Sequence, residues 1–174
     1  MALAYEPRTE LYRFHFGVVL GTVLLATLLQ VYLPPYLPFD IPLDLPLLVV
    51  IYFGFSRRNP TTGLLLGLAV GILQDALIYE PIQHPIGLFG MAKTVLGFAA
   101  SSLSSRVDTD HARARLLLVF AFYHLHQIIY AGSQRLLLDQ PAQFISLAGL
   151  EAALVNSLLG MLAFHFLDRF RRTL

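Results

Sequence analysis

The chain has 174 residues, a formal net charge of +1 and a hydrophobic content of 56%, and only 13% of its residues are charged. This composition excludes an ordinary soluble domain and indicates an integral membrane protein, with no basic run or stripe that would suggest nucleic-acid binding. Cysteine is absent, which excludes disulfides, thiol catalysis and cysteine-ligated metals.

Apolar runs along the chain predict an all-α bundle of six membrane-spanning helices, in a single domain that covers residues 1–174. The first run is about 20 residues long and lacks a small-residue cleavage pattern, so we expect a retained helix rather than a signal peptide. No predicted loop has room for a separate soluble domain. The predicted spans cover residues 14–33, 45–56, 61–79, 86–104, 116–138 and 147–167.

The second predicted span is short. Asp44 is a good N-cap residue and Pro46 suits the first turn, so the helix is expected to begin there. A helix from Asp44 to Arg57 is only about 20 Å long, whereas the hydrocarbon core of a bilayer is about 30 Å thick. We therefore expect the proline-rich segment 34–46 to enter the bundle, where other helices shield its backbone.

Basic residues lie at alternate ends of the predicted spans. They precede the first span and follow the second, fourth and sixth, whereas the other connections carry acidic residues and no Lys or Arg. Because Lys and Arg accumulate in cytoplasmic loops, both termini are predicted to face the cytoplasm. The basic set is Arg8, Arg13, Arg57, Arg58, Arg106, Arg113, Arg115, Arg169, Arg171 and Arg172, and the acidic set is Asp40, Asp44, Glu80 and Asp139.

Small residues recur on one face of the third predicted span. Gly63, Gly67 and Gly71 are four residues apart, and Asp75 is the next step along the same helical face. Such spacing lets two helix backbones approach closely, so this face is predicted to be a packing seam. The seam is either internal to the bundle, which we favour, or a receptor for a transmembrane helix of another protein.

Four charged residues lie inside the predicted spans: Asp75, Lys93, Arg135 and Glu151. At about 1.5 Å per residue, all four lie roughly 4 to 11 Å deep in the outer half of the membrane. A charge near the membrane centre costs roughly 2.5 to 3.5 kcal/mol on insertion scales, so each needs a partner or a function. We predict two interior ion pairs, Asp75 with Lys93 and Arg135 with Glu151. The alternative is that the long cationic side chains reach the headgroups.

Neutral polar residues also lie within the predicted spans. His124 and His126 are two positions apart and therefore face different directions, so they do not form a metal site by themselves. We interpret them as neutral histidines that hydrogen-bond within the bundle, with a proton relay as the weaker alternative. Gln74, Gln127 and Asn156 are predicted to make hydrogen bonds between helices.

Catalysis is not predicted. The sequence contains no phosphate-binding loop, metal-ligand pattern or pair of catalytic aspartates, and Asp75 with His84 is the best acid–base pair available. We therefore expect a protein that is not an enzyme and that carries no cofactor and no metal.

The segment from Pro46 to Ser104 resembles the rod shape-determining protein MreD family. The resemblance rests on the short Pro-led helix LPLLVVIYFGFSRRNP and on the following stretch GLLLGLAVGILQDALIYEPIQHPIGLFGMAKTVLGFAA. It covers roughly a third of the chain, together with the six-span layout, while the outer spans match only in hydropathy. The matching positions, which we take as partner-binding or helix-packing residues, are Gly63, Gly67, Gly71, Asp75, Gly87 and Gly97.

This resemblance implies a noncatalytic subunit of the bacterial cell-wall elongation machinery in the cytoplasmic (inner) membrane. Its implied partners are MreC, the synthase RodA with a penicillin-binding transpeptidase, and the filament protein MreB. The implied fold is similar to the substrate-binding components of energy-coupling-factor transporters. A vitamin-type transport component is therefore the alternative function, with the four intramembrane charges as ligand contacts. Contact of Lys93 and Arg135 with the phosphates of a lipid-linked wall precursor is the third possibility.

Overall fold

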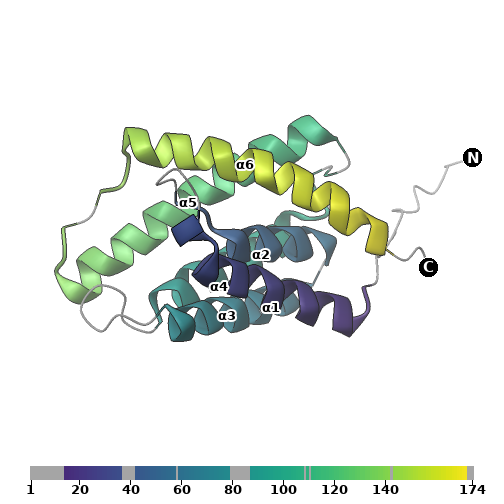
Figure 1. Ribbon diagram of the computed structural model, residues 1–174, viewed down its shortest axis with the longest axis horizontal. Coiled ribbons are helices and arrows are strands. Elements are labelled where there is room, and N and C mark those ends of the chain that lie inside the picture. Colours follow the sequence, from purple (N-terminus) through teal and green to yellow (C-terminus); the bar gives the residue numbers. More distant parts are fainter. Residues whose placement is uncertain are drawn as a thin grey trace, which may run out of the picture.

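The computed structural model describes residues 14–36, 42–57, 59–78, 87–107, 109, 111–141 and 143–171. These residues form six α-helices and two short 3-10 helices, and they contain no strand (Figure 1). All six predicted helices are therefore confirmed, two of them with the predicted bounds. The elements are α1 (Phe16–Tyr32), η1 (Pro34–Tyr36), α2 (Leu45–Ser56), α3 (Pro60–Leu77), α4 (Leu88–Leu103), α5 (Ala112–Leu138), α6 (Leu147–Leu167) and η2 (Asp168–Phe170).

Some residues on which the predictions depend lie outside the described part of the chain. They include the end of the third predicted span at residue 79 and the start of the fourth at residue 86. The individual residues concerned are Arg8, Arg13, Asp40, Arg58, Glu80, His84 and Arg172.

Three of the helical segments are long and apolar enough to cross a membrane: α3, α5 and the continuous segment formed by α6 and η2. The other three helices are shorter, with 17 residues in α1, 12 in α2 and 16 in α4. Length and composition therefore support a membrane protein, while a crossing by all six helices stays a prediction.

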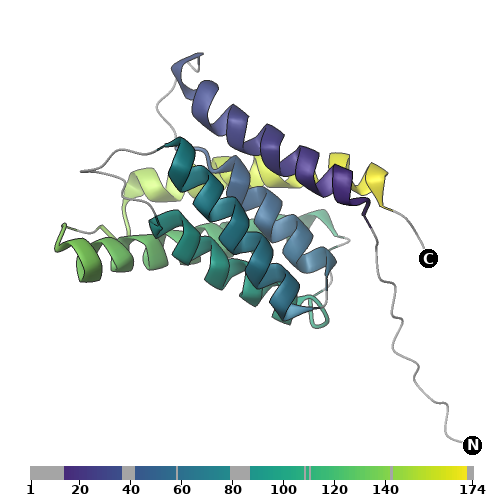
Figure 2. The same ribbon diagram turned by 90° about the horizontal axis from the view of Figure 1, so that it is seen from below.

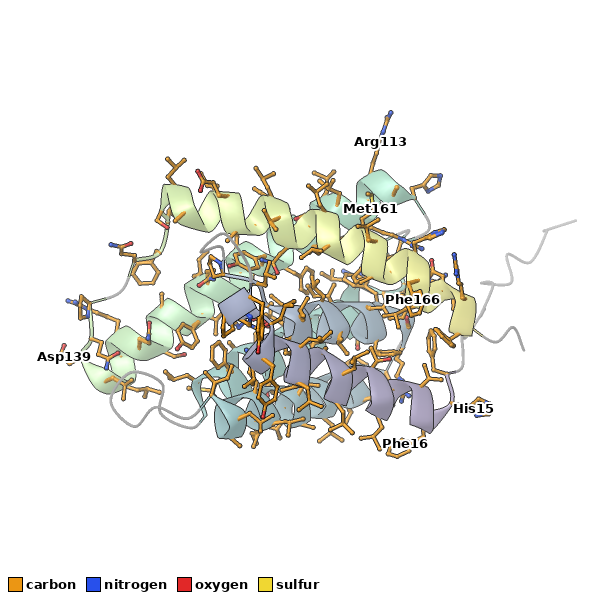
Figure 3. The ribbon with its side chains drawn as sticks, viewed as in Figure 1. His15, Phe16, Arg113, Asp139, Met161 and Phe166 are labelled. Carbon is orange, nitrogen blue, oxygen red and sulfur yellow. The ribbon has the colours of Figure 1, made fainter. Side chains whose placement is uncertain are left out.

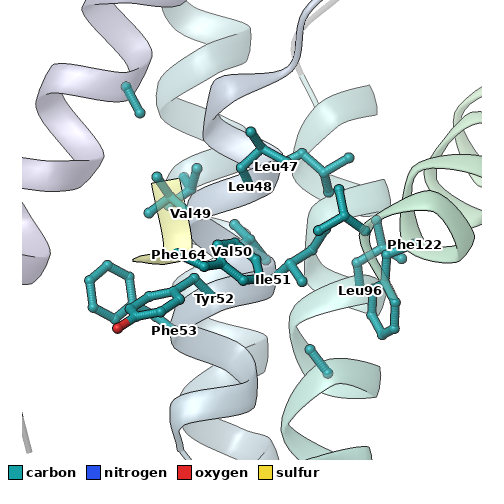
Figure 4. Close-up of a cluster of buried hydrophobic side chains, with 14 of the residues drawn as sticks. Leu47, Leu48, Val49, Val50, Ile51, Tyr52, Phe53, Leu96, Phe122 and Phe164 are labelled. Carbon is teal, nitrogen blue, oxygen red and sulfur yellow. The ribbon is translucent and has the colours of Figure 1, made fainter. Parts of the chain in front are cut away.

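The centre of the bundle is α2, the shortest helix. All ten residues from Pro46 to Phe55 are buried, and each of the other five α-helices contacts α2. Figure 4 shows its side chains packed with Leu96 of α4, Phe122 of α5 and Phe164 of α6. A helix that is apolar on every face is expected to be buried. Because protein surrounds α2, its length of about 18 Å does not have to match the thickness of a bilayer.

The bundle has two ends, which we name after the acidic residue that organises each. At the Asp168 end, α1 begins and α6 ends (Figure 1). There Asp168 accepts a hydrogen bond from the hydroxyl of Tyr52 at 2.9 Å and pairs with Arg115 at 2.7 Å and Arg171 at 2.8 Å. These contacts join the last turn of α2 to the start of α5 and the end of α6. At the opposite end, the Asp44 end, α2 begins.

Six of the eight described Lys and Arg residues lie at the Asp168 end, as judged from the helix ends they flank. Figure 3 shows Arg113 pointing away from the bundle at the start of α5, and Asp139 at the far end of the same helix. The basic residues at the Asp168 end are Arg57, Arg106, Arg113, Arg115, Arg169 and Arg171.

The predicted glycine seam lies inside the protein, between α3 and α4, which run side by side in Figure 2. A Cβ atom on Gly71 would lie 2.6 Å from the Cα of Gly90, and one on Gly67 would lie 2.6 Å from the carbonyl carbon of Lys93. Gly63 and Gly97 face each other in the same way. The backbone of α4 thus occupies this face, so the seam packs helices and is closed to a partner helix.

We expect Gly67→Ala to destabilise the fold, because the added methyl group meets backbone atoms of α4 that cannot rotate away. Overpacking of this kind costs at least about 1 to 3 kcal/mol. The measurement is the unfolding midpoint in mild detergent, with Gly17→Ala as the control, since a Cβ atom on Gly17 has nothing within 4 Å. Equal midpoints for the two variants would show that the seam is looser than described.

Candidate functional site

The start of α2 is held by side chains from other helices. Residues 42–44, just before α2, have non-helical backbone. Gln30 of α1 makes two hydrogen bonds to the backbone around this start of α2. Its Nε2 donates to the carbonyl of Leu43 at 2.7 Å, and its Oε1 accepts from the amide of Leu45 at 2.9 Å. A buried backbone group without a partner is costly, so Gln30 makes this entry into the bundle possible.

Asn156 of α6 makes the equivalent contacts from the other side. Its Oδ1 accepts from the amide of Asp44 at 2.8 Å, and its Nδ2 donates to the carbonyl of Pro42 at 2.9 Å. The side chain is fully buried. The predicted role of Asn156 in bonding between elements is therefore confirmed. The expected insertion of the proline-rich segment is limited to the residues next to α2, because Asp44 is buried and Leu43 is partly buried, whereas residues 34–36 and Pro42 are exposed.

Asp44 itself joins α2 to α4 and α5. Its Oδ1 accepts from the amide of Leu47, which confirms it as the N-cap of α2. Its Oδ2 lies 2.7 Å from Nζ of Lys93, whose side chain has no exposed surface. Nζ also lies 3.4 Å from Nε2 of His126 and 4.8 Å from the ring centre of Phe89. The cation is thus surrounded by a carboxylate, an imidazole and an aromatic face.

This arrangement corrects the predicted pairing of Lys93 with Asp75. The carboxylate of Asp75 instead accepts three backbone hydrogen bonds at the start of α4, from Gly87 at 2.9 Å, Phe89 at 3.1 Å and Gly90 at 2.9 Å. Gly87 is the N-cap of α4 at a φ of 112° and has no side chain to cap the helix. Asp75 therefore supplies the missing cap from α3, where its charge also favours the positive end of the helix dipole.

The second predicted pair is also not formed. Arg135 on α5 and Glu151 on α6 are both exposed, and no ion pair joins them in the structure. The exposure of Arg135 agrees with the alternative in which a long cationic side chain reaches the headgroups, whereas Lys93, for which the same alternative was open, is buried.

Several neutral polar residues agree with the prediction only in part. Gln127 bonds within its own helix, where its Nε2 donates to the hydroxyl of Tyr123 at 3.0 Å. His124 agrees with its interpretation as a histidine that hydrogen-bonds within the bundle, because its Nδ1 lies 3.0 Å from the carbonyl of Phe120. Gln74 is buried, and its Oε1 has no hydrogen-bond partner among the described residues.

Gln30 is the polar contact that sequence reasoning missed entirely. It is the last polar residue of α1, close in sequence to the proline-rich segment whose backbone needs donors and acceptors. The position of Gln30 near this segment was the signal from which the contact could have been predicted.

Two of the four predicted intramembrane charges, Lys93 and Asp75, are inaccessible to a substrate. Lys93 has no exposed surface and Asp75 is 3% exposed, and both are already satisfied by protein groups. The residues that the structure describes also hold no cluster of three His, Cys, Asp or Glu side chains able to bind a metal ion. The buried polar network is thus suited to fixing helix positions.

An open apolar groove lies between α1 and α6, with α2 as its floor. Its volume is about 380 Å³. The hydroxyl of Thr22 is its main polar group, and this donates to the carbonyl of Val18 within α1. The lining residues are Gly17, Val18, Gly21, Thr22, Leu25, Ala26, Leu29, Leu45, Leu48, Val49, Ala163, Phe166, Leu167 and Phe170.

Two glycines of α1 face open space in this groove. A Cβ atom built on Gly17 or on Gly21 would have no heavy atom within 4 Å, in contrast to those of the seam between α3 and α4. The two residues are four apart and therefore lie on the same face of the helix. The groove thus carries small residues at the spacing used for close helix packing, and none of the helices that the structure describes occupies it.

Comparison with known proteins adds no assignment: no protein family, curated protein or solved structure matches the chain.

We expect Asp44 and Lys93 to be energetically coupled. Lys93→Met or Asp44→Asn alone leaves the partner buried and unpaired, at a cost of about 3 to 5 kcal/mol. The double variant is expected to lose less than the sum of the two single losses, in a cycle measured from unfolding in detergent. The matched cycle that combines Asp75→Asn with Lys93→Met is expected to show a smaller coupling. A larger coupling in that second cycle would restore the pairing predicted from the sequence.

Proposed function

We propose that this protein is a noncatalytic membrane subunit of the bacterial rod elongation complex, where it binds MreC and helps to organise peptidoglycan synthesis and cell shape. The proposal rests on the resemblance of residues 46–104 to the MreD family and on one structural observation, the open groove between α1 and α6. It places the chain in the inner membrane with both termini in the cytoplasm.

The groove supports the binding of a single transmembrane helix. Glycine inside a helix costs roughly 0.5 to 1 kcal/mol relative to alanine, so Gly17 and Gly21 are favoured where another backbone must come close. The seam of α3 shows how this chain uses the same spacing internally, with α4 packed directly on Gly67. A partner helix in the groove would contact Gly17 and Gly21 in the same way. MreC is a single-span protein in the resembled family, so its membrane helix is the proposed occupant.

The larger assembly is proposed from the same resemblance. RodA, a penicillin-binding transpeptidase and MreB are the further partners. The concentration of described Arg residues at the Asp168 end supports a cytoplasmic position for that end, near a filament or anionic headgroups.

The alternative of a vitamin-type transport component is less well supported. It requires the four intramembrane charges as ligand contacts, but two of them, Lys93 and Asp75, are buried and bonded to Asp44 and to the start of α4. The same burial argues against a direct contact of Lys93 with a lipid phosphate.

We expect Gly21→Leu to weaken the binding of MreC while leaving the fold intact, because the new side chain fills open space in the groove. The expected loss is at least about tenfold in affinity, which corresponds to roughly 1.4 kcal/mol. The measurement is the affinity of purified protein for MreC in nanodiscs. The matched control is Gly132→Leu on α5, where a Cβ atom also has nothing within 4 Å and which lies outside the groove.

The two ways in which this experiment can fail are distinct. If the unaltered protein does not bind MreC, the proposed function is wrong. If it binds MreC and Gly21→Leu binds equally well, the function stands and the groove is not the docking surface.

The proposed orientation predicts opposite labelling at the two ends. The chain has no cysteine, so single-cysteine variants need no background removal. A membrane-impermeant maleimide is expected to label Gln143→Cys, at the Asp44 end, in cells with a permeabilised outer membrane. Arg113→Cys, at the Asp168 end, is expected to react only after lysis. The reverse pattern would overturn the orientation.

A further inference from the structure

A second cavity lies toward the Asp44 end, between the middle of α5 and the start of α6. Its volume of about 330 Å³ falls within the range of small-molecule sites, which begins near 300 Å³. The residues that line it are Pro42, Tyr123, His124, Gln127, Gln143, Phe144, Ile145, Ser146, Ala148 and Gly149. None of them is acidic, Lys or Arg, so the cavity is suited to an uncharged ligand.

The wall formed by α5 offers hydrogen-bond acceptors. Gln127 uses its Nε2 on the hydroxyl of Tyr123, which leaves its Oε1 without a partner among the described residues. Nδ1 of His124 lies 3.0 Å from the carbonyl of Phe120. Because a carbonyl oxygen only accepts, the proton of the ring lies on Nδ1, and Nε2 of the neutral ring is an acceptor.

The wall formed by α6 offers donors. Oγ of Ser146 accepts from the amide of Gly149 at 3.0 Å, so its own hydroxyl hydrogen is available to a ligand. The amide of Ala148, in the first turn of α6, makes no hydrogen bond in the part of the chain that the structure describes, as is usual for the first amides of a helix. The amide group of exposed Gln143 adds both a donor and an acceptor.

We propose that this cavity binds a neutral sugar ring. Each sugar hydroxyl both donates and accepts, which matches the acceptors on α5 and the donors on α6. The C–H groups of a sugar ring pack against aromatic faces, and the exposed ring of Phe144, which lines the cavity, is available for this contact. A charged ligand would find no opposite charge here. The proposal concerns a site separate from the groove and does not depend on the binding of MreC.

The rim of the cavity indicates where the sugar comes from. Ile145, which lines the cavity, is 77% exposed, and Leu147, two residues further along the chain, is 73% exposed; both are large and apolar. At this end of a membrane bundle, such side chains lie most favourably in lipid. A sugar carried as a lipid headgroup would enter beside them with its acyl chains in the bilayer, whereas a free sugar would enter from the water.

The test uses the full chain in phosphatidylcholine nanodiscs, with and without monoglucosyl diacylglycerol, and with methyl glucoside as the free sugar. Native mass spectrometry and amide hydrogen exchange in the first turn of α6 report binding. We expect retention of the glycolipid and slower exchange at Ala148. Binding of methyl glucoside alone would support the same site with a soluble source. Binding of neither, or equal retention of phosphatidylcholine in the site, would overturn the proposal.

Two variants locate the ligand. Gln127→Leu removes an acceptor, and Ala148→Leu fills the cavity from an exposed position, so it leaves the packing of the bundle unchanged. Each is expected to lower retention of the glycolipid at least about tenfold. Gln134→Leu, on the same helix but outside the cavity, is the matched control and is expected to bind normally. Normal binding by Ala148→Leu would place the sugar elsewhere and refute the assignment.

Discussion

The rest of the structure depends on the burial of one short helix. Because α2 begins at the buried residue Asp44, protein side chains supply the hydrogen-bond partners of the peptide groups at its start. Gln30, Asn156 and Asp44 bond to these groups from α1, from α6 and from the helix's own N-cap. Asp44 then requires a cation, which is Lys93. A single backbone constraint thus determines the side chains on three other helices and the register between them.

The start of α4 is likewise stabilised by a side chain from another helix. Its N-cap is a glycine in the left-handed region, so the helix has no capping side chain of its own, and Asp75 reaches across from α3. Because the seam of glycines brings α3 and α4 into backbone contact, the carboxylate of Asp75 is close enough to accept hydrogen bonds from three amides. Close packing and capping therefore reinforce each other. An aspartate in an apolar helix is explained by the backbone it satisfies, without a countercharge on Lys93.

Helix positions were predictable from the sequence, but the pairing of charges was not. Apolar run length and the Asp44–Pro46 signal located α2 with its observed bounds, because burial and capping are local properties. The partner of Lys93 was missed because Asp44 was counted as a loop residue, outside the predicted spans. Asp44 is buried because the short helix α2 begins among the other helices, and this burial is a tertiary feature. The exposure of Arg135 and Glu151 likewise depends on where α5 and α6 separate, which hydropathy does not encode.

Glycine spacing alone leaves open which neighbour each glycine face will meet. Gly63 and Gly67 have the same four-residue spacing as Gly17 and Gly21, yet a methyl group at the first pair would meet the backbone of α4 and at the second pair would meet nothing. The difference lies in the partner helix: α4 is tied to α3 by Asp75, whereas α1 is tied to the bundle chiefly through Gln30 and α2. A firmly anchored neighbour closes one face. The face of α1 that carries Gly17 and Gly21 therefore stays open to a partner from outside the chain.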